Sequence, residues 1–291
     1  MEKLNVLKCG PSELVLSPEL GGGIAKLNVY DKPVLRSWAG DESDLFSLAS
    51  NVLIPFSNRI SGEGFFWDKV WYELKPNMES ERFPIHGDAF QKPWGISKQG
   101  ESIQLKLTNG SFGPWQYSGK QVFNLYPNNL NITLTVKNTG RVLMPFGCGF
   151  HPWFPRTRET KLSFRAKTVW MEDKNHLPTT KVLLTDAPDW CFKMLRNLPS
   201  NWINNGYTGW DGMVRIEQGG KAVSCTLSAS RNLSTALVYS PNSSSDFFCF
   251  EPVSHPVNAI HLPGRPGLKV LKPGDSITAS INLNWNKALI N

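Results

Sequence analysis

The chain has 291 residues, a hydrophobic share of 40%, 11 Trp and 16 Phe, a composition that excludes an intrinsically disordered protein. Its 24 Gly and 21 Pro indicate many turns. The formal net charge of +7 comes from 31 Lys and Arg against 24 Asp and Glu. These basic residues are scattered rather than gathered in runs, so we expect no nucleic-acid partner.

The cysteines and the N-terminus indicate a reducing compartment. The five cysteines are widely spaced and form no CxxC pair, so they predict neither a zinc site nor a redox motif. The first ten residues, MEKLNVLKCG, contain no apolar signal core, and no segment is long enough to cross a bilayer. We therefore expect a cytoplasmic protein without a membrane partner.

In chain order, the predicted elements are nearly all strands. Residues 42–52, ESDLFSLASNV, could supply a turn or two of helix. After them, apolar and polar residues alternate with the period of a strand in five segments, each bounded by turn-forming residues. These segments are 102–110, 130–138, 221–230, 234–240 and 275–285. The pattern predicts an all-β protein, a large antiparallel β-sandwich that forms one domain over residues 1–291.

Five segments place an ionisable residue beside Gly, Pro or aromatic residues. They contain Arg59 (IPFSNRISG), His86 (FPIHGDAFQKPW), His151 (GCGFHPWFP), Asp211 (GYTGWDGMV) and Glu251 (CFEPVSH). Singly, each has an ordinary structural explanation: a hydrogen-bonded histidine, a salt-bridged arginine, or a turn at Trp-Asp-Gly. Together, and in this order, they form a more specific pattern.

This pattern resembles the aldose 1-epimerases, or mutarotases, from about residue 51 to the end of the chain. The matching motifs are Asn58-Arg59-Ile60 with Gly62, His86-Gly87 with Trp94, Gly149-Phe150-His151-Pro152-Trp153-Phe154, Asp211, and Glu251-Pro252. The His-Pro and Glu-Pro motifs are the specific parts, and Asp211 is the loosest match. The resemblance implies a galactose mutarotase-like supersandwich with a sugar lying across one open face.

The resemblance also implies roles for these residues in opening and closing a cyclic hemiacetal, which requires one base and one acid. Glu251 would take the proton of the C1 hydroxyl, and His151 would protonate the ring oxygen. The other candidates would bind the sugar: Asn58, Arg59, His86 and Asp211 by hydrogen bonds, and Trp153 and Trp210 by stacking. Arg59 could also keep Glu251 ionised. The reaction needs no metal and no cofactor.

The sugar preference rests on one departure from a related branch that acts on hexose 6-phosphates. There the His-Gly motif resembles His-Gly-Phe-Ala-Arg, and the Arg helps to hold the phosphate. Here Phe90 stands in place of that Arg, and Asp88 would repel a dianion. We therefore expect an unphosphorylated aldose, although Arg59 or Arg82 could compensate and a hexose-6-phosphate 1-epimerase stays open.

Three other functions stay open from the sequence. A non-catalytic carbohydrate-binding protein would need the aromatic residues but not both Glu251 and His151. A metalloenzyme could use His86, His151 and Glu251 as ligands. A glycosidase could pair Asp211 with Glu251.

Three histidines and the oligomeric state are less defined. His255 and His261 could support the site or only a loop, and His176, in a polar turn, is not expected at the site. The sequence leaves open whether the protein is a monomer or a homodimer.

Overall fold

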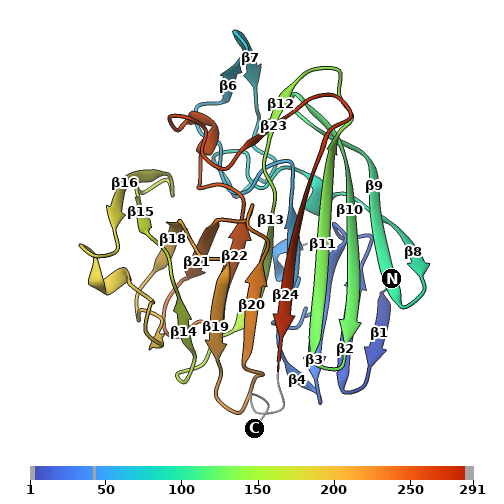
Figure 1. Cartoon of the computed structure of the whole chain (residues 1–291), viewed down its shortest axis with the longest axis vertical. Coiled ribbons are helices and arrows are strands. Elements are labelled where there is room, and N and C mark those ends of the chain that lie inside the picture. Colours follow the sequence, from blue (N-terminus) through green and yellow to red (C-terminus); the bar gives the residue numbers. More distant parts are fainter. Residues whose placement is uncertain (1–3, 42–43, 286–291) are drawn as a thin grey trace.

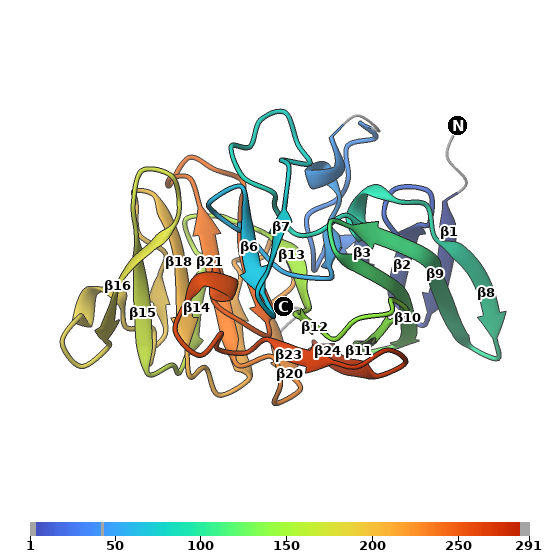
Figure 2. The same cartoon turned by 90° about the horizontal axis from the view of Figure 1, so that it is seen from above.

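A computed structural model describes residues 4–41 and 44–285 of the chain. In these residues, strands form two large antiparallel sheets that face each other (Figures 1 and 2). The first sheet has eleven strands in the described part of the chain. In spatial order they are β1 (Asn5–Cys9), β2 (Ser12–Ser17), β3 (Gly23–Val29), β5 (Ser50–Leu53), β13 (Gly149–Pro155), β22 (Phe247–Val253), β21 (Thr235–Ser240), β18 (Ile203–Thr208), β15 (Thr168–Glu172) and β16 (Pro178–Leu183), with β4 (Lys32–Pro33) paired to β3.

The second sheet has nine strands among the described residues. In spatial order they are β17 (Arg196–Asn197), β14 (Lys161–Phe164), β19 (Met213–Glu217), β20 (Cys225–Ala229), β24 (Ser276–Asn284), β11 (Asn129–Asn138), β10 (Trp115–Tyr126), β9 (Ser102–Phe112) and β8 (Gly95–Gln99). Two small sheets pair β6 (Gly64–Trp67) with β7 (Val70–Glu73), and β12 (Met144–Phe146) with β23 (Lys269–Leu271). Figure 1 shows the β6–β7 hairpin projecting at one end of the molecule.

The predicted alternation is confirmed in the second sheet. In β11, Leu130, Ile132, Leu134 and Val136 are buried, whereas the residues between them are partly or fully exposed. Strand β11 pairs along its length with β10 on one side and β24 on the other, so the apolar faces of all three strands align. These faces join a buried cluster that also includes side chains from the first sheet, among them Leu14 and Phe250. The all-β prediction is therefore confirmed.

Helical structure among the described residues consists of single 3-10 turns. These are η1 (Leu45–Ser47), η2 (Ala89–Gln91), η3 (Pro188–Trp190) and η4 (Ala259–His261). The segment for which a turn or two of helix was expected contains η1, capped by the Asp44 carboxylate, and strand β5 begins after two further residues. Glu42 and Ser43 at its start lie outside the described residues.

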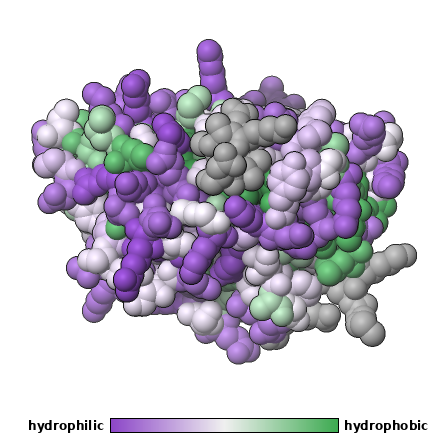
Figure 3. Space-filling view, turned by 90° about the horizontal axis from the view of Figure 1, so that it is seen from below, coloured by the Kyte–Doolittle hydropathy of each residue, from purple (hydrophilic) through white to green (hydrophobic). Residues whose placement is uncertain are grey.

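The hydrophobic residues, including most of the cysteines, lie mainly in the interior of this fold. Seen from below in Figure 3, the surface is mostly hydrophilic, with hydrophobic side chains in separate patches. Of the helical segments in the described residues, none has the length and apolar character needed to cross a membrane. All five cysteines are free thiols, and Cys148, Cys225 and Cys249 are buried as small hydrophobic residues.

Candidate active site

A pocket of about 450 Å³ lies against the first sheet. Four neighbouring strands each supply a lining residue: His151 from β13, Glu251 from β22, Tyr239 from β21 and Asn204 from β18. Loops complete the walls with Phe46, the 58–59 and 80–86 segments, the 174–176 turn and Trp202. The strand order therefore brings together residues as far apart in the sequence as His151 and Glu251.

His151 and Glu251 form the floor of this pocket. In the register of β13 against β22, Gly149 opposes Val253 and Trp153 opposes Cys249, so His151 lies opposite Glu251 on the same face. Nε2 of His151 is 3.4 Å from Oε1 of Glu251, and only 7% and 5% of the two side chains is exposed. Neither Glu251 Oε2 nor His151 Nδ1 has a hydrogen-bond partner among the described residues. Unpartnered buried polar atoms are costly and call for a ligand or a reaction that uses them.

Burial controls the protonation of this pair. It raises the pKa of the Glu251 carboxyl from 4.5 to about 8, against a smaller lowering effect of the Arg59 charge. Burial, with a smaller contribution from the positive charge of Arg36, lowers the pKa of His151 from 6.5 to about 3, against the raising effect of a backbone hydrogen bond. At neutral pH, Glu251 is therefore protonated and His151 is neutral, so the pair shares one titratable proton and that proton rests on Glu251.

The loop that carries Asn58 and Arg59 is locked to the loop that carries His86. The backbone N–H of Asn58 donates to Nδ1 of His86 (3.0 Å), and the N–H of His86 donates back to the carbonyl of Asn58 (3.1 Å). Nδ1 of His86 is therefore an acceptor, and the neutral ring carries its proton on Nε2. Burial is the main reason why the pKa of His86 lies well below 6.5, and the charges of His151 and Arg59 lower it as well. The ring is therefore neutral.

Arg59 does not keep Glu251 ionised, contrary to our expectation. Its guanidinium donates from Nε to Oε2 of Glu81 (2.8 Å) and from a second nitrogen to Oε1 (2.7 Å), which is a bidentate ion pair. Much of its charge is thus neutralised by Glu81. Burial outweighs the remaining effect on the Glu251 carboxyl.

Trp153 lines the pocket, but its ring is largely covered by protein groups. The His151 ring stacks on it with centroids 4.9 Å apart at 10°, and the Arg36 guanidinium lies 4.1 Å from its centroid. Phe247 packs at 4.8 Å, and only 7% of Trp153 is exposed. Little of the Trp153 ring is therefore free to stack on a sugar, and its expected stacking role is not supported. Its geometry fits a support for His151.

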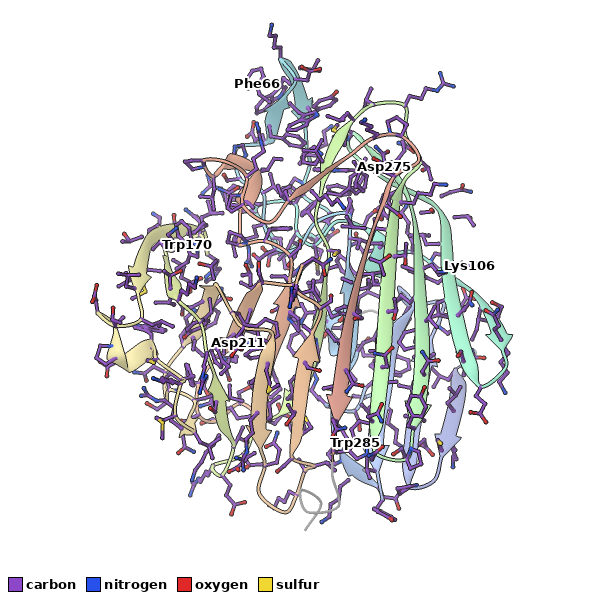
Figure 4. All side chains as sticks on the ribbon, viewed as in Figure 1. Phe66, Lys106, Trp170, Asp211, Asp275 and Trp285 are labelled. Carbon is purple, nitrogen blue, oxygen red and sulfur yellow. The ribbon has the colours of Figure 1, made fainter. Side chains whose placement is uncertain are left out.

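Asp211 and Trp210 lie outside the pocket, so their expected sugar-binding roles are not supported. They occupy the connection from β18 in the first sheet to β19 in the second, and Figure 4 shows Asp211 beside the strands of the second sheet. Asp211 is exposed and accepts from the N–H of Met213, whereas the buried Trp210 donates to the Met213 carbonyl. The turn uses both residues internally. Because Asp211 does not line the pocket, it also cannot pair with Glu251 as in a glycosidase.

Asp88 is directed away from the pocket, which removes one argument against a phosphorylated sugar. Its buried carboxyl accepts from the Tyr117 hydroxyl and pairs with Lys92 at 3.1 Å. Phe90 is buried and stacks at 5.3 Å on Phe46, so it supports the pocket wall from behind. Asp88 thus cannot repel a bound anion by direct contact.

The metal ligands considered from the sequence are not the ones that cluster. Among the described residues, His151, Glu251 and Cys249 have ligand atoms within 4.8 Å of one another, and this group omits His86. Because Nδ1 of His86 accepts from Asn58, only its Nε2 could bind a metal. The facial triad of His86, His151 and Glu251 is therefore not supported.

Several pocket residues were not predicted. Phe46, Trp202, Asn204 and Tyr239 lie in segments without a charged motif, so only the polar residue Asn204 between buried neighbours in β18 could have drawn attention. His176 was not expected at the site, yet it lines the pocket.

His255 and His261 do not line the pocket. The buried ring of His255 accepts from the N–H of Ser57 (3.1 Å) and donates to the Pro256 carbonyl (2.8 Å), so it holds two loops together. Nε2 of His261 lies 3.0 Å from the Ser61 carbonyl. Both contacts are structural.

Comparison with known proteins agrees with this geometry. The family model of the aldose 1-epimerases (Aldose 1-epimerase) matches residues 7–284. The uncharacterized protein YphB of Escherichia coli K12 is 32% identical over 91% of this chain and 97% of its own. A crystal structure of an E. coli K12 protein, b2544, described provisionally as an aldose 1-epimerase, has a TM-score of 0.92 at 29% identity and covers 98% of this chain and 100% of that one.

A more distant structure shows that the fold is shared beyond close relatives. The galactose mutarotase-like protein of Clostridium acetobutylicum has a TM-score of 0.85 at 18% identity, over 98% of this chain and 95% of that one. The family model spans almost the whole chain, and the paired glutamate and histidine lie in the motifs that suggested it. This chain belongs to the aldose 1-epimerase family.

Proposed function

We propose that this protein is a mutarotase, which interconverts the α and β anomers of an unphosphorylated aldose by general acid–base catalysis. The observation that carries the proposal is the 3.4 Å separation of His151 Nε2 and Glu251 Oε1 on the floor of the pocket. Ring opening moves a proton off the C1 hydroxyl and another onto the ring oxygen. Since both oxygens are bonded to C1, two adjacent acid–base groups suffice.

The proton held by the pair matches what the reaction needs. One partner must be able to give a proton and the other to take one, and the pair carries a single proton at neutral pH. Because that proton rests on Glu251, it must move to His151 before Glu251 can act as the base, across the short distance between them. Glu251 then takes the C1 hydroxyl proton, and His151 protonates the ring oxygen. The roles reverse when the ring closes on the other face of C1.

The proposed sugar-binding groups surround this pair. His86 presents its Nε2–H, since Nδ1 is occupied by Asn58. Arg59 lines the pocket with its charge balanced by Glu81, which suits a neutral hydroxyl better than an anion. The 58–59 and 86 loops are fixed by mutual hydrogen bonds, so these groups are positioned before the sugar arrives.

Polarimetry tests the proposal directly. Freshly dissolved α-D-glucose or α-D-galactose should reach anomeric equilibrium faster with the protein than in buffer, and dialysis against a chelator should leave the rate unchanged. The second result follows because proton transfer by two side chains requires no metal. A panel of aldoses followed by anomer-resolved NMR exchange would identify the preferred sugar. A rate equal to that in buffer for every sugar would reject the proposal, and a non-catalytic carbohydrate-binding protein would then explain the site.

A hexose-6-phosphate 1-epimerase is the second candidate, favoured by two cations at the pocket. Arg82 and Lys174 are exposed, line the pocket, and have no carboxylate within 4.0 Å among the described residues. Arg82 instead donates to Oδ1 of Asn175 (3.3 Å). Exposed cations are well solvated and contribute little to anion binding.

We therefore expect kcat/KM for glucose 6-phosphate to stay within about threefold of that for glucose, since a weak exposed contact contributes well under 1 kcal/mol. The R82A variant should change neither value by more than that factor. A preference for glucose 6-phosphate above about tenfold that disappears in R82A would instead select the second candidate.

A further inference from the structure

Glu172 organises one wall of the pocket without lining it. This residue ends β15, and its Oε1 accepts from the indole N–H of Trp202 (2.6 Å). Its Oε2 accepts from the amide of Asn204 (2.8 Å) and lies 3.1 Å from Nδ1 of His176. Trp202, Asn204 and His176 all line the pocket, and we call them the distal wall. A single carboxylate thus holds three pocket side chains at once.

The distal wall lies away from the acid–base pair. In the first sheet, β22 is followed by β21, β18 and β15. At about 4.8 Å per strand, β18 is about 10 Å and β15 about 14 Å from the strand that carries Glu251. A sugar with C1 at Glu251 would therefore direct its opposite edge toward the distal wall.

Hydrogen bonds and ring contacts hold the surroundings of the distal wall in place. The Asp173 carboxylate accepts from the backbone N–H groups of Asn175 (2.7 Å) and Leu177 (3.0 Å), which fixes the turn that presents His176. The His176 ring stacks on Trp202 with centroids 5.2 Å apart, and Tyr239 meets Trp202 edge-on at the same distance. Despite these contacts, 44% of Trp202 stays exposed.

The exposed groups suit a neutral sugar. Trp202 offers apolar surface for the C–H face of a pyranose, and Asn204, with its amide nitrogen held by Glu172, offers Oδ1 as an acceptor for a hydroxyl. The Glu172 carboxylate already accepts from Trp202, Asn204 and His176, so its charge is compensated inside the wall. The indole face of Trp202 and the amide oxygen of Asn204 suit C–H groups and hydroxyls better than an anion.

We infer that the distal wall is a subsite for the hydroxyl-bearing edge of a neutral aldopyranose remote from C1, and that Glu172 is its positioning residue. The inference rests on the proposed function, because it places C1 at Glu251. Glu172 acts through its three partners and does not take part in proton transfer. It therefore governs sugar binding and leaves the chemical step unchanged.

The E172Q variant tests this inference. Its amide has one acceptor oxygen and turns an N–H₂ group toward donors, so it cannot hold all three partners. We expect the Kd and KM for D-glucose and D-galactose to rise about tenfold with kcat within twofold of wild type, as for loss of about 1.4 kcal/mol of binding. Binding is measured by NMR titration. The indole N–H resonance of Trp202, assigned with W202F, should shift in E172Q.

The matched control is E13Q, which removes a partly buried carboxylate that pairs with Lys8 and Lys26 in the same sheet but outside the pocket. It should leave Kd, KM and kcat unchanged. If E172Q does not fold, W202F, which loses only one of the three hydrogen bonds, should still raise Kd about threefold.

Three results would overturn the inference: a Kd in E172Q equal to that of wild type, a fall in kcat with KM unchanged, or a wild-type protein that binds no aldose. A wild-type protein that binds aldoses without accelerating their exchange would reject the mutarotase proposal instead. The comparison of Kd values would still decide the role of Glu172.

Discussion

Glu251→Gln should lower kcat for anomer exchange at least about a hundredfold, because general acid–base groups typically contribute that much or more. Gln preserves the shape of the side chain and neither accepts nor releases a proton at neutral pH. KM should change little, since the amide still fits the same space beside His151. Anomer-resolved NMR exchange measures both constants. An unchanged kcat would remove Glu251 from the mechanism.

The same variant should be more stable than wild type above about pH 5. Below pH 4.5, the Glu251 carboxyl is protonated in both the folded and the unfolded chain. As the pH rises toward 8, the unfolded chain loses this proton while the folded chain keeps it, so the free energy of unfolding of the wild type falls. Gln does not titrate. The advantage of the variant should therefore grow from near zero at pH 4 to a few kcal/mol at pH 8, at about 1.4 kcal/mol per pH unit.

Denaturant titration of both proteins at pH 4, 6 and 8 measures this difference. A variant that loses activity while gaining stability cannot owe its inactivity to misfolding. Asp211→Asn is the matched control, because Asp211 is an exposed carboxylate outside the pocket. It should keep kcat within twofold of wild type, and a large loss of kcat in this variant would return Asp211 to the site.

His151→Gln should also lower kcat about a hundredfold, because it removes the other member of the proton-sharing pair. The double variant E251Q/H151Q should be no more than about threefold slower than the slower single variant, since residues that act as a unit lose their effect together. His261→Gln, at an exposed histidine outside the pocket, serves as the control. Losses that multiply in the double variant would show that the two groups act independently.

The pH profile of the wild type gives an independent check of the pair. The active form holds one proton, so kcat/KM should fall as the pH rises above about 8, where Glu251 loses it. On the acid side, kcat/KM should fall only near pH 3, where the His151 ring becomes protonated and the pair holds two titratable protons. The profile should thus be flat around neutrality. A steep rise in kcat/KM between pH 5 and 7 would mean that a group with an ordinary histidine pKa controls the reaction.

Local sequence patterns were enough to predict several of the strands and four of the residues that line the pocket. Alternation predicts which side chains of β9, β11 and β24 face the core, because side chains on a strand point to opposite faces in turn. The motifs around Arg59, His86, His151 and Glu251 bring these residues into one pocket, as the family resemblance implied. Each of these four residues is next in sequence to buried residues, and the packing of those neighbours in the core fixes its position.

The remaining parts of the site depend on contacts between segments that are distant in the sequence. Asp211 sits in a motif-like turn, but the chain crosses there from one sheet to the other and carries it away from the pocket. Trp153 is in the expected place, yet its ring is covered by His151 and Arg36. The physical reason is that alternation defines the faces of one strand, whereas the neighbours of that strand depend on pairings between distant segments. The order β22, β21, β18, β15 sets the distal wall opposite Glu251, and no local pattern in the sequence encodes that order.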